Sequence, residues 1–142
     1  MNTGTAANLP KVILDTNILI SAVGFGGKPR EILNLALKNQ IRAFTSPTLL
    51  AELEDVIHKK FPILSDDFTR LTRQIKKKFK TARPKKTIKV LKDTDDNRVL
   101  EAAIEGNCDY IITGDSELLD LKVYRKIKIV TPDQFLKLLK ET

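Results

Sequence analysis

The stretch 11–17, read K-V-I-L-D-T-N, decides the fold that this sequence predicts. Its apolar run at 12–14 has no polar alternation, which is typical of a strand buried on both faces of a parallel sheet. The run ends in Asp15, and a second run of the same kind, Y-I-I-T-G-D at 110–115, ends in Asp115. Because ligands of open parallel sheets gather outside the carboxyl ends of the strands, we expect both carboxylates at one functional edge.

Strand and helix patterns alternate along the rest of the chain, which indicates an α/β fold with a mainly parallel sheet. Further strands are expected at 42–45, 87–91 and 126–130, and the last two alternate lysines with apolar residues. Lysines discourage further pairing at sheet edges, so these two strands should be the edges. The expected fold is a three-layer α/β/α sandwich with a five-stranded parallel sheet in the order 3-2-1-4-5, which makes the strands of Asp15 and Asp115 neighbours at the topological switch point.

The length of 142 residues fits one domain, which we expect to span residues 11–142 after a flexible tail at 1–10. No apolar run approaches the length of a membrane span, and the first ten residues lack the pattern of a signal peptide. Cys108 is the only cysteine, so no internal disulfide is possible, which fits a reducing compartment. We therefore expect a cytoplasmic protein with no membrane partner.

The net charge of +7 is unevenly distributed along the chain. Residues 68–92 contain eleven basic and no acidic residues, and taking these eleven charges from the total leaves −4 on the rest of the chain. A localised positive charge indicates a polyanionic partner such as nucleic acid. The alternative is a solvated helix face, and charge alone does not separate the two.

Four acidic residues are expected to meet at the carboxyl edge of the sheet: Asp15, Glu52, Asp96 and Asp115. Each has an alternative explanation when taken singly. The three aspartates could be helix N-caps, with Asp95 competing with Asp96 for that position, and Glu52 could face solvent. Taken together, a cluster of four carboxylates must either raise its pKa values or bind a cation.

The chemistry of this cluster favours one class of ion. Oxygen ligands without histidine or cysteine suit Mg²⁺ or Mn²⁺ and argue against zinc. The only histidine, His58, follows Glu52 on the same expected helix, where a structural or exposed role is the simpler interpretation. The sequence also has no phosphate-binding loop of the G-x-x-x-x-G-K type.

Four motifs carry a resemblance to a known family: V-I-L-D-T-N at 12–17, S-P-x-L-L-A-E at 46–52, D-x-D-D-N-R-V-L-E-A-A at 93–103 and Y-I-I-T-G-D at 110–115. In this order they resemble the PIN-domain ribonucleases, and most closely the VapC-like toxin components of bacterial and archaeal toxin–antitoxin pairs. The likeness runs from about Lys11 to the final helix. It implies a five-stranded parallel sheet between helices and a metal-dependent endoribonuclease that uses Mg²⁺ or Mn²⁺.

The resemblance also implies roles for single residues. The catalytic and metal-binding quartet of the family is matched by Asp15, Glu52, Asp96 and Asp115. Glu117 falls where many members carry a further Asp, as a possible fifth ligand. Supporting polar positions around the ligands are matched by Asn17, Thr113 and Ser46.

The basic segment is expected to hold the RNA, because an acidic site repels its own polyanionic substrate. The expected contacts are Lys76, Lys77, Lys78, Lys80, Arg83, Lys85 and Lys86. As the toxin resemblance implies, the other expected partners are a small antitoxin protein and a second copy of the chain.

Two alternatives to the ribonuclease remain open. A phosphatase or phospho-acceptor domain also places an Asp after its first strand, but usually adds a second Asp two residues later, where this chain has Asn17. A catalytically inactive PIN domain would bind only RNA or a partner, and the intact acidic quartet argues against it.

Overall fold

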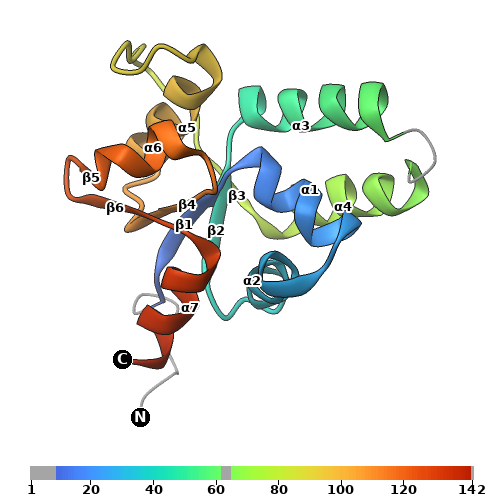
Figure 1. Cartoon of the computed structure of the whole chain (residues 1–142). Coiled ribbons are helices and arrows are strands. Elements are labelled where there is room, and N and C mark those ends of the chain that lie inside the picture. The colour runs from blue at the N-terminus through green and yellow to red at the C-terminus, as the bar shows by residue number, and fades with distance from the viewer. Residues whose placement is uncertain (1–8, 62–64, 142) are drawn as a thin grey trace.

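A central sheet organises the residues that this computed structural model describes, 9–61 and 65–141. Within them, six strands lie in the order β3-β2-β1-β4-β6-β5 (Figure 1). The first five strands in this order are parallel, and β5 is antiparallel to β6. The strands are β1 (Lys11–Leu14), β2 (Arg42–Thr45), β3 (Lys80–Thr81), β4 (Tyr110–Ile112), β5 (Val123–Tyr124) and β6 (Ile127–Val130).

Strand β1 lies inside the sheet between β2 and β4. Its Ile13 is in register with Phe44 of β2 and with Ile111 of β4. The backbone N–H of Asp15 continues this pairing by donating to the carbonyl of Ile112 at 3.0 Å. The five parallel strands therefore have the predicted order 3-2-1-4-5, and the chain leaves β1 and β4 side by side at the same edge.

Seven helices occur in the described residues and cover both faces of the sheet (Figure 1). Residues of β1 alternate between the two faces because side chains of a strand point to opposite sides. Val12 and Leu14 join a core with helices α1, α2, α4 and α7, whereas Ile13 joins a core with α5 and α6, so the predicted three-layer sandwich is confirmed. The helices are α1 (Thr16–Gly24), α2 (Gly27–Leu37), α3 (Pro47–Lys60), α4 (Ser65–Lys78), α5 (Thr94–Glu105), α6 (Ser116–Leu121) and α7 (Pro132–Lys140).

The prediction of a strand at 87–91 is wrong. The third strand is instead β3, where Lys80 and Thr81 are in register with Phe44 and Thr45 of β2. The backbone of 87–91 finds other partners, because its N–H groups donate to the buried side chains of Asn97 and Glu101 on α5. Amides that are already satisfied in this way do not need a neighbouring strand.

The predicted strand count of five is also wrong by one. The expected last strand is present as β6, but it is not the edge, because β5 pairs with it through a short hairpin. The two turn residues, Arg125 and Lys126, have φ of 48° and 72°. Two-residue hairpin turns of type I′ need positive φ at both central positions and usually place Asn or Gly there, so this sequence lacked the ordinary signal.

Two expectations concern the chain as a whole. The predicted tail at 1–10 lies mostly outside the described residues, and its boundary with the domain stays a prediction. No helix among the described residues has the length and apolar character needed to cross a membrane.

Candidate active site

Asp15 lies at the junction of β1 and α1 and is only 6% exposed. Thr113, directly after β4, is fully buried beside it and donates its hydroxyl hydrogen to Asp15 Oδ2 at 2.7 Å. The same Thr113 hydroxyl accepts the backbone N–H of Asp115 at 3.0 Å. One threonine hydroxyl therefore links the two aspartates that follow the neighbouring strands β1 and β4.

Burial raises the pKa of the Asp15 carboxyl above its ordinary value. The Thr113 hydroxyl and nearby backbone N–H groups lower this pKa, and the charge of Asp115 raises it further. Although Asp15 occupies the N-cap position of α1, its side chain makes no capping hydrogen bond. Asp115 does cap its helix, because Oδ1 accepts the backbone N–H groups of Glu117 and Leu118 at 2.8 and 3.3 Å. The N-cap explanation therefore accounts for Asp115 but not for the buried carboxylate of Asp15.

Asp96 lies in the first turn of α5 and is 6% exposed. The N-cap of this helix is Asp93, whose Oδ1 accepts the backbone N–H groups of Asp95 and Asp96 at 2.8 and 3.4 Å. The Asp96 side chain is thus not used for capping, and its buried Oδ2 has no hydrogen-bond partner in the part of the chain that the structure describes. Burial, followed by the charges of Asp115 and other nearby carboxylates, raises the pKa of Asp96 to about 7.

Glu52 is half-buried on α3. Burial and the charges of Asp95, Asp15 and Asp93 raise the pKa of Glu52 to about 7. The N-cap of this helix is Ser46, whose buried Oγ accepts the backbone N–H of Leu49 at 3.1 Å. Ser46 therefore caps the helix of Glu52, which is a structural use of a residue that the sequence placed around the ligands.

The two other predicted polar residues lie at helix starts. Asn17 is exposed in the first turn of α1, next to Asp15. Glu117 is half-buried in the first turn of α6, and its Oε1 accepts the backbone N–H of Lys92 at 2.9 Å. One oxygen of Glu117 is thus already used to hold the segment before α5.

Charges of the predicted carboxylates act on one another in part. The charge of Asp15 raises the pKa values of both Glu52 and Asp96, and the charge of Asp115 raises those of Asp15 and Asp96. Within residues 9–61 and 65–141, however, no three acidic, histidine or cysteine side chains converge closely enough to form a finished metal site. The unpartnered Asp96 Oδ2 and an oxygen-only donor set nonetheless fit Mg²⁺ or Mn²⁺.

Sequence reasoning missed the role of Asp93. It considered Asp95 and Asp96 as caps of α5, whereas the cap is Asp93, and its charge raises the pKa values of Glu52 and Asp96. The signal was present as D-T-D-D at 93–96, since Asp is a favoured N-cap residue and an acidic first turn is typical of a helix start.

The basic residues predicted to bind RNA separate into two groups. Lys76, Lys77 and Lys78 are exposed in the last turn of α4, and Lys80 is exposed on β3. The other three follow β3 and are exposed in the segment that leads to α5; they are Arg83, Lys85 and Lys86.

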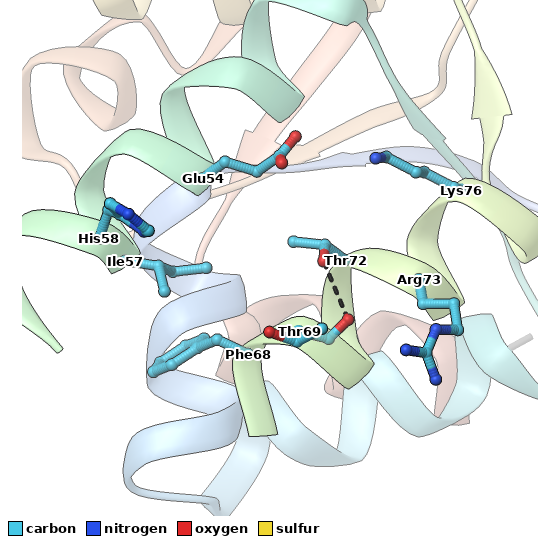
Figure 2. A pocket seen from close by; sticks show the side chains of 8 residues that line it. All are labelled: Glu54, Ile57, His58, Phe68, Thr69, Thr72, Arg73 and Lys76. Carbon is cyan, nitrogen blue, oxygen red and sulfur yellow. Dashed lines mark hydrogen bonds between the residues drawn. The ribbon is translucent and has the colours of Figure 1, made fainter. Parts of the chain in front are cut away.

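Lys76 also lines a pocket of about 430 Å³ between α3 and α4, together with Glu54 and His58 (Figure 2). Glu54 follows Glu52 by two residues, which is a rotation of about 200° around a helix of 3.6 residues per turn. The pocket therefore opens on the side of α3 that faces away from Glu52 and the other carboxylates.

Three comparisons relate the chain to known proteins. The family model of the PIN domain matches residues 11–117. The chain is 31% identical over 145 residues to the uncharacterized protein MJ1680 of Methanocaldococcus jannaschii, with 89% of each chain covered.

Two solved structures have a similar fold. VapBC2 from Rickettsia felis, solved bound to a DNA fragment from its promoter, superposes with a TM-score of 0.60 at 15% identity over 85% of this chain and 98% of that one. PAE2754 from Pyrobaculum aerophilum superposes with a TM-score of 0.61 at 14% identity over 94% and 91%. At these identities the likeness concerns the fold alone.

Proposed function

The chain belongs to the PIN-domain family, a family of nucleases, and from this premise we propose that it is a Mg²⁺- or Mn²⁺-dependent endoribonuclease. The observation that carries the proposal is the buried Oδ2 of Asp96, which lacks a hydrogen-bond partner among the described residues. An unpartnered buried carboxylate oxygen is costly, and a divalent cation would satisfy it. A residue of this kind at the carboxyl edge of a parallel sheet is a candidate for catalysis.

The quartet Asp15, Glu52, Asp96 and Asp115 would hold the cation, with Glu117 as a further ligand. A bound divalent cation supplies positive charge for the phosphate and lowers the pKa of a water molecule for attack. Carboxylates bind cations only when ionised, so binding must displace the protons that Glu52 and Asp96 retain up to a pH of about 7.

The remaining polar residues hold the ligands in place. Thr113 fixes Asp15 by its 2.7 Å hydrogen bond and is itself locked by the backbone N–H of Asp115. This contact keeps the Asp15 carboxylate from rotating. It suits a residue that does not bind the cation itself but holds a ligand in position. Asn17 is exposed beside Asp15 and would orient the ligands or the attacking water.

RNA is proposed as the substrate on the family resemblance, and the basic residues are proposed as its phosphate contacts. They would offset the repulsion between an acidic site and a polyanion. Of the residues expected from the sequence, we propose Arg83, Lys85 and Lys86, which follow β3, as the main contacts. The other four lie on α4 and β3 and are compared with them below; they are Lys76, Lys77, Lys78 and Lys80.

The fold likeness to VapBC2 supports a role as the toxin of a toxin–antitoxin pair. Its partners would be a small antitoxin whose segment covers the acidic site and a second copy of the chain, in the cytoplasm. Light scattering tests the homodimer, and a monomer at all concentrations would contradict it. Co-elution with the protein encoded by the neighbouring gene tests the antitoxin.

The central experiment incubates the purified chain with mixed RNAs, first with Mn²⁺ and then with EDTA. We expect cleavage with Mn²⁺ that stops on chelation, and no cleavage by Asp15→Asn at matched concentration. Cleavage by Asp15→Asn at the wild-type rate would contradict the assignment of the site. Hydrolysis of a phosphate monoester without RNA cleavage would favour the phosphatase, and RNA binding without cleavage would favour the inactive domain.

A further inference from the structure

The segment 82–92 between β3 and α5 carries five basic and no acidic residues, and we name it the basic loop. Its basic side chains are all exposed. Since β3 is parallel to β2, and β2 to β1, the chain enters this loop at the same edge of the sheet where Asp15 leaves β1. The basic side chains are those of Arg83, Lys85, Lys86, Lys89 and Lys92.

Buried polar side chains of α5 fix the backbone of the basic loop. Glu101 Oε2 accepts the N–H of Ile88 at 2.7 Å. Asn97 Oδ1 accepts the N–H groups of Val90 and Leu91 at 3.2 and 2.9 Å, and its Nδ2 donates to the carbonyl of Leu91 at 2.8 Å. The loop is thus ordered by hydrogen bonds that leave its lysines in solvent.

The attachment points of the loop lie next to the proposed ligands. Asn97 directly follows Asp96 on α5. Glu117, which accepts the backbone N–H of Lys92 at 2.9 Å, lies two residues after Asp115 on α6. The same two helix starts therefore present the carboxylates and hold the end of the basic loop.

The predicted RNA contacts on α4 and β3 have different surroundings. Lys78 and Lys80 line a pocket with Ile41 and Arg42, at the beginning of β2 and away from the edge of Asp15. Lys76 lines the pocket on the side of α3 that faces away from Glu52. The long basic segment of the sequence is thus two separate surfaces, of which the basic loop is the one attached to the carboxylate edge.

We propose, resting on the proposed ribonuclease function, that the basic loop holds the phosphates of single-stranded RNA on either side of the bond to be cut. Lys92, whose backbone N–H is held by Glu117 at the start of α6, would contact the phosphate closest to that bond. A loop that is already ordered by Asn97 and Glu101 loses little further conformational entropy when RNA binds. Contacts of this kind give affinity that does not depend on sequence and falls with salt.

The test compares two variants that lose the same charge at different places. The loop variant carries Lys85→Gln, Lys86→Gln, Lys89→Gln and Lys92→Gln. The matched control carries Lys76→Gln, Lys77→Gln, Lys78→Gln and Lys80→Gln. All eight lysines are exposed, so both proteins should melt at the wild-type temperature.

The readout is the Kd for a fluorescent single-stranded RNA at several salt concentrations in EDTA, where no cleavage occurs. We expect the loop variant to lose at least about tenfold in affinity at low salt and to show a flatter salt dependence, since each lost phosphate contact reduces the slope by roughly 0.7 on single strands. The matched control should lose much less affinity. Equal losses, or a larger loss in the matched control, would overturn the proposal.

Cleavage with Mn²⁺ separates this proposal from the proposed function. If the wild-type chain binds RNA but does not cleave it, the ribonuclease proposal fails, and the two Kd values still decide the role of the loop. If it cleaves RNA and the two variants bind alike, only the loop proposal fails. A wild-type chain that binds no RNA would overturn both.

Discussion

The first and second turns of α5 each bury one carboxylate, and the two are bonded in opposite ways. Asp96 is 6% and Glu101 8% exposed. Glu101 Oε2 accepts two hydrogen bonds, from the backbone of Ile88 and from Arg98 Nη2, both at 2.7 Å. Asp96 Oδ2 accepts none from the residues that the structure describes. Burial alone therefore does not separate a structural carboxylate from one that is available to a ligand, whereas the count of donors does.

This difference has an energetic meaning. A buried carboxylate with partners stabilises the fold, whereas one without partners costs free energy or keeps its proton. Burial first, and then the charges of neighbouring carboxylates, raise the pKa of Asp96 to about 7. A buried carboxylate of this kind is a candidate for binding a ligand from outside the folded core.

The largest expected effect is on activity, and it comes from Asp96→Asn. The amide keeps the shape of the side chain but cannot supply a negative charge to a cation, so RNA cleavage with Mn²⁺ should fall by at least about 100-fold. The melting temperature in EDTA should stay equal or rise, because repulsion from Asp115 and Asp15 is removed. Cleavage rate and melting temperature are measured on the same preparation. Wild-type cleavage by this variant would remove Asp96 from the site.

Glu101→Gln should have the reverse effect, a loss of stability rather than of the catalytic group. It weakens the bonds to Arg98 and Ile88, and hydrogen bonds to charged groups contribute about 1.5–3 kcal/mol each, so the free energy of unfolding should fall by about 2 kcal/mol. Urea denaturation measures this loss. The control is Glu105→Gln, the same chemical change at an exposed position of α5, which should stay within about 0.5 kcal/mol of wild type. Equal stability of the two variants would contradict a stabilising role of the hydrogen bonds to Glu101.

The contrast also explains which parts of the fold the sequence could predict. The strands with continuous apolar runs or clear flanking turns, β1, β2 and β4, lie where they were expected. The prediction of a strand at 87–91 failed because the alternation of Ile88, Lys89 and Val90 is equally compatible with a loop. The backbone N–H groups of this segment donate to Asn97 and Glu101 of α5. Hydrogen-bond partners on another element cannot be predicted from the local pattern of apolar residues. Strand β3, with two residues, is too short for any periodicity.

The candidate site shows the same limit. The sequence and the family resemblance predict the four carboxylates at one edge of the sheet. The choice of N-cap among the three acidic residues at 93–96 depends on local geometry instead. Only the structure assigns that cap to Asp93, which leaves the side chain of Asp96 without a capping role. The division of the basic segment into two surfaces depends on where β3 enters the sheet, which no local pattern indicates.

The smallest expected effect is a change of stability with pH, and it isolates the protonation of Asp96. The pKa of Asp96 is raised from 3.8 to about 7 in the folded chain, and that of Glu52 from 4.5 to about 7. Between these limits the folded state binds more protons than the unfolded state, so stability should fall as the pH rises from about 4 to 7. In EDTA the melting temperature should therefore be higher at pH 5.5 than at pH 8, by a few degrees in order of magnitude.

Comparison with Asp96→Asn assigns this dependence to its source. The variant lacks the proton of Asp96 but keeps the raised pKa values of Glu52 and Asp15, so its melting temperature should fall less over the same interval. Glu105→Gln should follow the wild type. Asp133, whose pKa is lowered by Lys28 and Lys137, acts in the opposite direction but only below its ordinary pKa, outside this interval. At pH 8, Mn²⁺ should raise the melting temperature of the wild type more than that of Asp96→Asn, because an ion that binds only the folded state stabilises it. Parallel curves for the wild type and Asp96→Asn would mean that Asp96 is already ionised at pH 5.5, and its unpartnered oxygen would then need another explanation.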